Sequence, residues 1–447
     1  MRRTFKVALF AVSLAFVSSI AAQQRPIPVG PVSSDTYRTT YLRLGGGNDD
    51  GLLYEPVKPG PNAHIALVTA HPNGDAFNAI QTTEMAKRGY TVLAVVHRGD
   101  TSDLTVLAQP LSKAVEYLRT IKGVEHVVIM GHSGGGELVT FYQNLAEHGP
   151  SACNGPEKIF PCNGKGLSGL GKPDAIVILD STLGAFHQMS AVDPAVDGDK
   201  RITSLDMFAA ANGYDPKQHQ ATYSAEFAKR FYAAQSARNN AIIDSALARL
   251  KAIEAGKGEF TDDEPLLIRG MGENAGGTRL YQPDPAFAAH TKKPHTLLKA
   301  DGTTPVMIVP SVRGPVGQQF AEQLNALSVM SQDTTVRKFL VHSAIRTTAD
   351  FAITADGITG VDWKSAITSA PGNAEGITVP ALIVSNTCHY LMMQDEILYD
   401  HLASKDKTLV YNEGSTHMFT PCKPEYGDTT KRAFDYVNGW LNKPGRF

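Results

Sequence analysis

Residues 124–136 constrain the fold of this chain more than any other stretch. They read Val-Glu-His-Val-Val-Ile-Met-Gly-His-Ser-Gly-Gly-Gly. Residues 127–130 form a short apolar, β-branched run, which is typical of a buried strand, and a helical pattern follows at residues 137–148. A G-x-S-x-G sequence between a strand and a helix predicts a sharp turn that holds its serine, here Ser133, in a strained and exposed position.

The glycines of this turn have a physical role. The turn is so tight that side chains two residues before and two residues after Ser133 would collide with the backbone. The following helix begins near Gly134, and its first backbone N–H groups and partial positive charge can stabilise a developing oxyanion. The pattern therefore predicts a nucleophile elbow with Ser133 as the nucleophile and the Gly134 N–H as one oxyanion donor.

Length and composition agree with an enzyme and exclude some partners. The chain has 447 residues, a formal net charge of −2, 42% hydrophobic residues and 19% charged residues. The length is large for one domain and favours a core with an insertion. Nothing in the charge balance indicates nucleic acid or an anionic membrane surface as a partner.

The N-terminus has the pattern of a targeting segment. Arg2, Arg3 and Lys6 are basic, residues 7–20 are apolar, and small residues follow. We interpret residues 1–22 as a secretory signal peptide. The alternative is a membrane anchor, but the apolar run is short for a membrane span. We therefore expect a secreted or periplasmic protein without a stable membrane anchor.

The cysteines support export. Their number is four, and an even count in an exported protein predicts disulfides. Cys153 and Cys162 flank one short loop and are paired here, which leaves Cys388 with Cys422. The alternative is four free buried thiols. Because no C-x-x-C or H-E-x-x-H spacing occurs, we predict no metal site. Residues 164–169 match G-x-G-x-x-G, but a Cys-Pro loop precedes them and a predicted strand follows, so we do not interpret them as a dinucleotide site and predict no organic cofactor.

Apolar strands alternate with helical segments along most of the chain. This alternation predicts an α/β fold with a mostly parallel central sheet flanked by helices. The predicted strands are residues 37–44, 52–57, 65–70, 92–96, 127–130, 175–179, 381–385 and 408–412. The predicted helices are residues 82–87, 111–121, 137–148 and 432–441.

The alternation stops in the middle of the chain. We interpret residues 191–375 as a largely helical cap over the carboxyl edge of the sheet, where ligands bind in such folds. This cap separates the first part of the core, residues 23–190, from the second part, residues 376–447. The alternative is a separate domain unrelated to the site. Within this part we expect helices at residues 221–255 and 319–330, a Gly/Pro/Asp-rich stretch at 256–294, and a strand at 336–342.

A nucleophilic serine needs a base and an oxyanion hole. The loop after the last predicted strand contains His417, which is the candidate base; the alternative is a surface histidine. The loop after the strand at 65–70 reads His-Pro-Asn-Gly-Asp. Asn73 or its neighbour in this loop is the candidate for a second oxyanion N–H beside Gly134. The alternative for Asn73 is an ordinary Asn-Gly turn.

These motifs together resemble the α/β-hydrolase superfamily. The resemblance covers roughly residues 37–190 and 378–445. Members of the superfamily commonly carry a helical cap inserted between these two parts of the core. The resemblance implies Ser133 as nucleophile, His417 as base, and oxyanion N–H groups from the Asn73 region and Gly134.

The chain departs from the superfamily at the acid. Members usually carry Asp or Glu just after the strand that matches residues 381–385, but here the loop reads Asn-Thr-Cys-His-Tyr. A minority arrangement places the acid after the preceding core strand, where Asp180 stands in the chain order Ser, Asp, His. We favour Asp180; Asp395 and Glu396 are the alternatives, and Asp180 could instead be a helix cap or a structural carboxylate.

The sequence thus predicts a serine hydrolase that cleaves carboxylic esters through an acyl-enzyme, with a small-molecule ester as its partner. Aromatic residues of the cap favour an apolar or aromatic substrate, unless they only form the core of the cap. They are Phe208, Tyr223, Phe227, Phe231 and Tyr232. Two alternatives remain open: an amidase or peptidase on the same scaffold, and a non-catalytic binding protein on a degraded hydrolase fold. The missing acid at the usual position is the support for the second.

Overall fold

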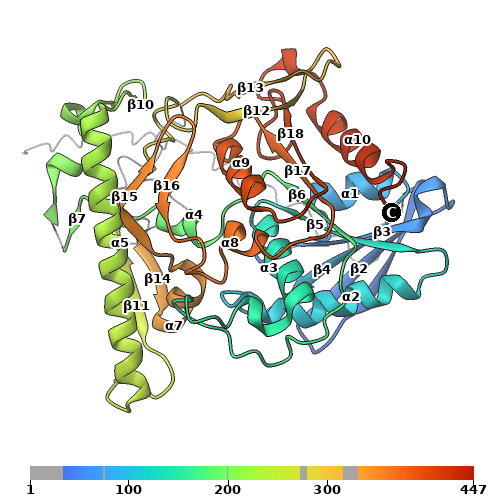
Figure 1. Ribbon diagram of the computed structural model, residues 1–447, viewed down its shortest axis with the longest axis horizontal. Helices are drawn as coiled ribbons and strands as arrows, with labels where there is room; N and C mark the ends of the chain where they lie inside the picture. Colours follow the sequence, from blue (N-terminus) through green and yellow to red (C-terminus); the bar gives the residue numbers. More distant parts are fainter. Residues whose placement is uncertain (1–33, 74–75, 199, 272–278, 316–330) are drawn as a thin grey trace, which may run out of the picture.

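The computed structural model describes most of the chain (Figure 1). The described residues are 34–73, 76–198, 200–271, 279–315 and 331–447. The predicted signal peptide, 1–22, and the predicted helix at 319–330 lie outside them. Among the helices that the structure describes, none combines the length and apolar character needed to cross a membrane.

A ten-stranded sheet forms the centre of the molecule. Its strands are β1 (Tyr37–Arg43), β2 (Asp49–Pro56), β3 (Ile65–Ala70), β4 (Thr91–His97), β5 (His126–His132), β6 (Ala175–Leu179), β12 (His290–Leu298), β13 (Val306–Pro310), β17 (Ala381–Asn386) and β18 (Lys407–Asn412). Their order across the sheet is β1-β2-β4-β3-β5-β6-β17-β18-β12-β13. The pairs from β4 to β12 are parallel, and antiparallel strands stand at both ends. The predicted α/β fold class, with a mostly parallel central sheet flanked by helices, is confirmed.

Helices cover both faces of this sheet (Figure 1). On one face lie α1 (Ile80–Lys87) and α10 (Thr429–Leu441), and on the other lie α2 (Ala108–Thr120), α3 (Gly134–His148), α8 (Ala370–Ala374) and α9 (Met392–His401). In β5, Val127 and Ile129 pack towards α2 and α3, whereas Val128 and Met130 pack towards α1 and α10. A strand buried on both faces has a continuous apolar sequence, which is why the sequence predicted it.

The inserted part contains one long helix and several short strand pairs. The helix is α5 (Ala225–Glu254), which runs along one side of the molecule (Figure 1) and packs on β15 (Thr347–Ile353). The short pairs are β7–β8 (Val196–Asp197 with Lys200–Arg201), β9–β10 (Tyr214–Asp215 with Gln220–Ala221), β11–β14 (Pro265–Arg269 with Ser331–Thr335) and β15–β16 (the latter Ile358–Val361). The helix predicted at 221–255 is therefore present.

Two expectations for the inserted part need correction. The strand predicted at 336–342 is wrong: α7 (Val336–Lys338) and a π-helical turn, η7 (Phe339–Ser343), form there. A short apolar run does not distinguish a buried strand from a buried helix. In addition, β12 and β13 come from this part but belong to the main sheet, where β12 pairs with β18. The polar sequence of β12, which includes Lys292 and Pro294, hid the strand.

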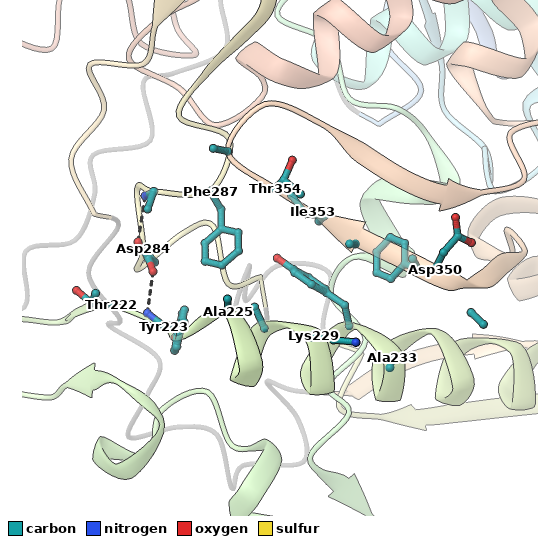
Figure 2. Close-up of a pocket in the computed structure, with 17 residues that line it drawn as sticks. Thr222, Tyr223, Ala225, Lys229, Ala233, Asp284, Phe287, Asp350, Ile353 and Thr354 are labelled. Atoms are coloured by element: carbon teal, nitrogen blue, oxygen red, sulfur yellow. Dashed lines mark hydrogen bonds between the residues drawn. The ribbon is translucent and has the colours of Figure 1, made fainter.

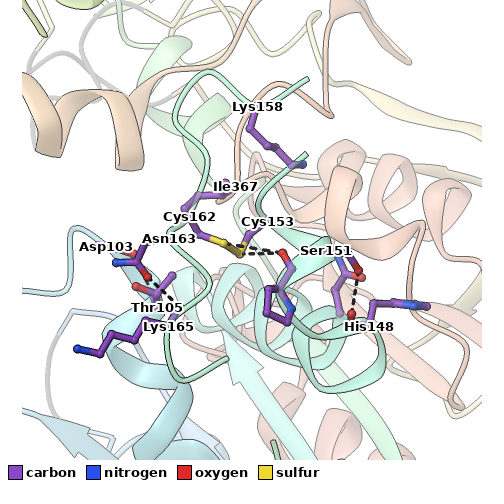
Figure 3. Close-up of a disulfide and its surroundings, with 12 residues drawn as sticks. Asp103, Thr105, His148, Ser151, Cys153, Lys158, Cys162, Asn163, Lys165 and Ile367 are labelled. Carbon is purple, nitrogen blue, oxygen red and sulfur yellow. Dashed lines mark hydrogen bonds between the residues drawn. A yellow bond between two sulfur atoms is a disulfide. The ribbon is translucent and has the colours of Figure 1, made fainter. Parts of the chain in front are cut away.

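Both predicted disulfides are present. Cys153 and Cys162 close a loop after α3 with Cα atoms 5.4 Å apart (Figure 3). Cys388 and Cys422 join the loop after β17 to the loop after β18, with Cα atoms 6.4 Å apart. The second bridge therefore ties together two loops at the carboxyl edge of the sheet, one of which contains His417.

Candidate active site

Ser133 occupies a strained turn between β5 and α3. Its φ is 58° and its ψ is −126°, in a region that non-glycine residues rarely adopt. A methyl group at Gly131 would lie 2.0 Å from the Gly135 carbonyl oxygen, and one at Gly135 would lie 2.7 Å from the Ala70 carbonyl oxygen. Both glycines are therefore required, as the G-x-S-x-G pattern predicted.

Backbone hydrogen bonds hold the elbow on the end of β6. The Ser133 N–H donates to the Leu179 carbonyl at 3.1 Å, and the Ser133 carbonyl accepts from the Thr182 N–H at 3.3 Å. Gly134 is the first residue of α3, where backbone N–H groups have no partner inside the helix. The elbow and the residue that follows β6 are thus fixed side by side.

That residue is Asp180, and it contacts His417. The His417 Nδ1 donates to Asp180 Oδ2 at 2.6 Å, and the other carboxylate oxygen accepts from the Asn386 N–H at 3.2 Å. Asp180 is fully buried, and burial alone would oppose its ionisation. His389 and His417 beside it outweigh that effect and hold the pKa of Asp180 below its usual range. Asp180 is therefore a carboxylate that can orient His417.

The two alternative acids have other partners. Asp395 accepts a hydrogen bond from the Ser181 N–H at 3.0 Å, and burial together with the charge of Asp180 raises the pKa of Asp395 well above its usual value. Glu396 lies 2.8 Å from His295 Nε2 and accepts from two backbone N–H groups of β12. Of the three carboxylates considered from the sequence, the structure brings Asp180 to His417.

His417 stands between two other histidine rings, which the sequence analysis did not identify as part of the site. Its ring centroid is 4.4 Å from that of His132 and 4.5 Å from that of His389. His132 Nε2 donates to the His417 carbonyl at 2.9 Å. Burial lowers the pKa of His132 to about 3 and also lowers the pKa of His389. Both flanking rings are therefore neutral at physiological pH.

His389 also lies close to the carboxylate. Its Nδ1 is 2.8 Å from Asp180 Oδ2, but the ring is not oriented for a hydrogen bond to it. His389 occupies the loop after β17, where the resemblance noted from the sequence led us to look for an acid. That position was the signal in the sequence that could have indicated this residue.

The contact between His132 and the His417 backbone brings the elbow loop against the loop of the candidate base. In the part of the chain that the structure describes, no hydrogen bond joins Ser133 Oγ to His417. Such bonds are often long without substrate and tighten only in the complex. Ser133, which directly follows His132, is half-buried.

The oxyanion loop differs from expectation. The Asn73 N–H donates to His71 Nδ1 at 3.0 Å, and Asn73 Oδ1 accepts from the Thr101 hydroxyl at 3.2 Å. The loop does reach the elbow, because a methyl group at Gly134 would lie 3.3 Å from His71 Nε2. The Asn73 N–H thus already has a partner, and His71 is the side chain that lies against Gly134.

Asp180, His389 and His417 have the composition of a metal site. Their ligand atoms all lie within 4.8 Å of one another. However, Nδ1 of His417 and Oδ2 of Asp180 are only 2.6 Å apart. Two ligands of a tetrahedral zinc, each about 2.0 Å from the metal, are separated by roughly 3.3 Å. The spacing therefore fits a shared proton between the histidine and the carboxylate better than a shared metal ion.

A polar cavity of about 320 Å³ adjoins the oxyanion loop. It includes Asn73, and an ion pair between Asp100 and Lys338 at 2.8 Å spans it from the core to the inserted part. Its lining residues are Asn73, Gly99, Asp100, Thr101, Ser102, Gln332, Asp333, Thr334, Lys338, His342 and Ser343. A ligand portion in this cavity would meet hydroxyl, amide and charged groups.

A second cavity, of about 560 Å³, is apolar and lies between α5 and β15 (Figure 2). Phe287 points into this region in Figure 2, and Tyr223 and Tyr232 also line the cavity. Phe227 and Phe231, which the sequence also indicated for a substrate pocket, are buried in the core. The remaining candidate, Phe208, packs edge-on against Tyr214.

Comparison with known proteins finds only distant structural similarity. No family model matches the chain, and no curated protein does. Among solved structures, a hypothetical protein from Pseudomonas aeruginosa is 13% identical, with 92% of this chain and 95% of that chain covered and a TM-score of 0.42. Est1E from Butyrivibrio proteoclasticus is 10% identical, with 90% and 97% covered and a TM-score of 0.37. A dienelactone hydrolase from Anabaena variabilis is 10% identical, with 92% and 97% covered and a TM-score of 0.36. At these scores we draw no functional argument from them.

Proposed function

We propose that this chain is a serine hydrolase that cleaves carboxylic esters through Ser133, His417 and Asp180. The observation that carries the proposal is the 2.6 Å contact between His417 Nδ1 and the ionised Asp180, next to a serine held at a φ of 58° on an elbow. A buried carboxylate on the Nδ1 of a histidine fixes the tautomer in which Nε2 is free to accept a proton.

The proposed reaction uses this tautomer twice. His417 Nε2 takes the proton of Ser133 while the serine oxygen attacks the ester carbonyl, and Asp180 stabilises the imidazolium that results. The Gly134 N–H stabilises the oxyanion. The alcohol leaves with the proton from His417, and water then hydrolyses the acyl-enzyme by the same steps in reverse order.

The cavities refine the proposed substrate. Because the polar cavity adjoins the oxyanion loop, we propose that one side of the ester carries hydroxyl or charged groups. The apolar or aromatic group expected from the sequence would then belong to the other side of the ester. A panel of p-nitrophenyl esters and glyceryl esters of equal chain length distinguishes these requirements.

We also propose that the protein acts outside the cytoplasm. Two disulfides support this location, since such bonds persist in oxidising compartments. Detection of the mature chain, beginning near residue 23, in the periplasm or medium would test it.

Labelling by a fluorophosphonate tests the catalytic assignment. We expect the probe to modify Ser133, and we expect Ser133→Ala to abolish both labelling and ester hydrolysis without loss of fold. Ser151→Ala is the matched control, because Ser151 is an exposed serine just before the loop that Cys153 and Cys162 close. Retention of more than a few per cent of activity by Ser133→Ala would show that the nucleophile is wrong.

The same experiment addresses the two alternatives. An amidase or peptidase would label in the same way but would turn over p-nitroanilides faster than the matching esters. A binding protein on a degraded fold would neither label nor turn over any ester. The intact contact between His417 and Asp180 favours the enzyme, because it supplies the acid whose absence was the argument for a degraded site.

A further inference from the structure

His71 occupies the place where the second oxyanion donor was expected. It directly follows β3 and lies against Gly134, the residue that follows the proposed nucleophile. A methyl group at Gly134 would lie 3.3 Å from His71 Nε2 and 3.5 Å from His71 Cε1. The outer edge of the imidazole, rather than the Asn73 backbone, therefore faces the start of α3.

The backbone of the same loop sets the tautomer of this ring. The Asn73 N–H donates to His71 Nδ1 at 3.0 Å, so Nδ1 is an acceptor. A neutral imidazole that accepts at Nδ1 carries its proton on Nε2. Among the described residues, none accepts a hydrogen bond from His71 Nε2. The N–H on the edge that faces Gly134 is thus free for a ligand.

The surroundings keep the ring neutral. Burial lowers the pKa of His71 and outweighs the opposing effect of the Asn73 backbone contact, and the nearby His417 lowers this pKa further by repulsion. Burial also lowers the pKa of His132, one of the two histidines that flank His417, to about 3, so His132 adds no positive charge. A neutral donor needs no counterion, and it gains hydrogen-bond strength when negative charge develops on its acceptor in a desolvated site.

We propose that His71 donates its Nε2–H to the substrate oxyanion, together with the Gly134 N–H. The oxyanion hole would then combine one side-chain donor with one backbone donor, and the Asn73 N–H would serve to fix the His71 tautomer. This inference rests on the proposed function, because it requires a tetrahedral oxyanion formed by Ser133.

Two conservative substitutions distinguish the role of His71 Nδ1 from that of His71 Nε2. The side-chain amide of Asn reaches the position of Nδ1, and that of Gln reaches the position of Nε2. His71→Asn therefore keeps an acceptor for the Asn73 N–H but removes the donor at Gly134. His71→Gln keeps a donor at Gly134 but gives up the acceptor. A role in supporting the loop and a role as oxyanion donor predict opposite orders of activity.

We expect His71→Asn and His71→Ala to lower kcat about 10²–10³-fold with little change in KM, as removal of an oxyanion donor does. We expect His71→Gln to retain at least tenfold more kcat than His71→Asn. Binding of phenylboronic acid, whose serine adduct is tetrahedral and anionic, should weaken in the same order. Circular dichroism and the thermal midpoint of each variant check the fold.

Wild-type kcat in His71→Asn, or a kcat of His71→Gln as low as that of His71→Ala, would overturn the assignment of His71. The activity of Ser133→Ala, measured in the same assay, shows whether the proposed function or only the role of His71 has failed. If Ser133→Ala kept its activity, the proposed function would fail and this inference with it. If Ser133→Ala were inactive while His71→Asn was fully active, only the role of His71 would be refuted.

Discussion

The ends of two neighbouring strands, β6 and β17, lie side by side but bring different groups to His417. The strands are parallel and in register, with Leu179 opposite Val384. After β6 the chain turns through Asp180, which has a φ of 43° and a buried carboxylate. After β17 it continues into Thr387, Cys388 and His389, without a carboxylate.

The two strand ends are joined at the carboxylate itself. The Asp180 N–H donates to the Val384 carbonyl at 2.9 Å, and the Asn386 N–H donates to Asp180 Oδ1 at 3.2 Å. The end of β17 thus supplies a donor and the His389 ring, whereas the end of β6 supplies the charge. We therefore expect an acid at the end of either strand to be able to reach His417, because both strand ends lie at one edge of the sheet.

The largest effect should come from the carboxylate after β6. We expect Asp180→Asn to lower kcat about 10⁴-fold, by analogy with serine-protease triads, because the amide favours the wrong tautomer of His417. Glu396→Gln is the matched control and should keep kcat within about threefold, since Glu396 contacts His295 and β12. Near-normal turnover in Asp180→Asn with collapse in Glu396→Gln would move the acid to α9.

The second prediction restores a carboxylate at the end of β17. Since His389 Nδ1 lies 2.8 Å from Asp180 Oδ2, an acid at position 389 starts close to His417. We expect His389→Asp to raise the kcat of Asp180→Asn at least tenfold, because it recreates an ionised partner for the base. His401→Asp in the same background is the control, and a gain that is equal in both would mean that position 389 has no special access to His417.

The two disulfides offer a third comparison. In the chain-entropy model, loops with sequence separations of 34 and 9 residues predict stabilisation of about 4 and about 3 kcal/mol. We expect Cys388→Ala with Cys422→Ala to lower the free energy of unfolding in urea by more than Cys153→Ala with Cys162→Ala. We also expect a severalfold loss of kcat only in the first pair, because that bridge ties the loops of His389 and His417. Equal kcat in both double variants would argue against a positioning role for the bridge.

Elements with a pattern in their own sequence could be predicted, whereas elements placed by contacts with distant segments could not. Strands β5, β6, β17 and β18 could be predicted because burial on both faces leaves a continuous apolar run. Strand β12 could not, because its lysines and proline carry no such pattern and its place is set by pairing with β18. Both elbow glycines were predicted from the G-x-S-x-G pattern, although only the clash at Gly131, with the Gly135 carbonyl, is local; the clash at Gly135 is with the Ala70 carbonyl at the end of β3.

The candidate site shows the same division. Ser133, His417 and Asp180 could be named from their positions after strands, and the structure brings Asp180 to His417. The packing of the His132 and His389 rings on either side of His417 could not, although the position of His389 after β17 was a signal, because this packing brings together the end of β5 and two loops that are distant in sequence. The hydrogen bond from the Asn73 N–H to His71 could not be predicted either, because the sequence does not show which backbone groups bond to side chains.

The smallest effect on activity should come from the second buried carboxyl group, on α9. Asp395 is fully buried near Asp180. Burial, and to a lesser extent the charge of Asp180, raise the pKa of Asp395 well above its usual value. The folded protein therefore holds a proton on Asp395 that the unfolded chain releases above a pKa of about 3.9. We expect Asp395→Asn to leave kcat nearly unchanged, because the amide oxygen can still accept from the Ser181 N–H.

The free energies of unfolding of the wild type and of Asp395→Asn should nevertheless diverge as pH rises. Where the folded state binds one more proton than the unfolded state, the free energy of unfolding falls with pH by up to about 1.4 kcal/mol per unit. Asp395→Asn lacks this proton, so its stability relative to the wild type should increase from about pH 4 towards neutral pH. Asp180 acts in the opposite sense: its lowered pKa gives stability that is present above the unfolded value and is lost as pH falls. Urea denaturation of both proteins at several pH values measures the difference, and a gap that stays constant with pH would show that Asp395 is ionised in the folded state.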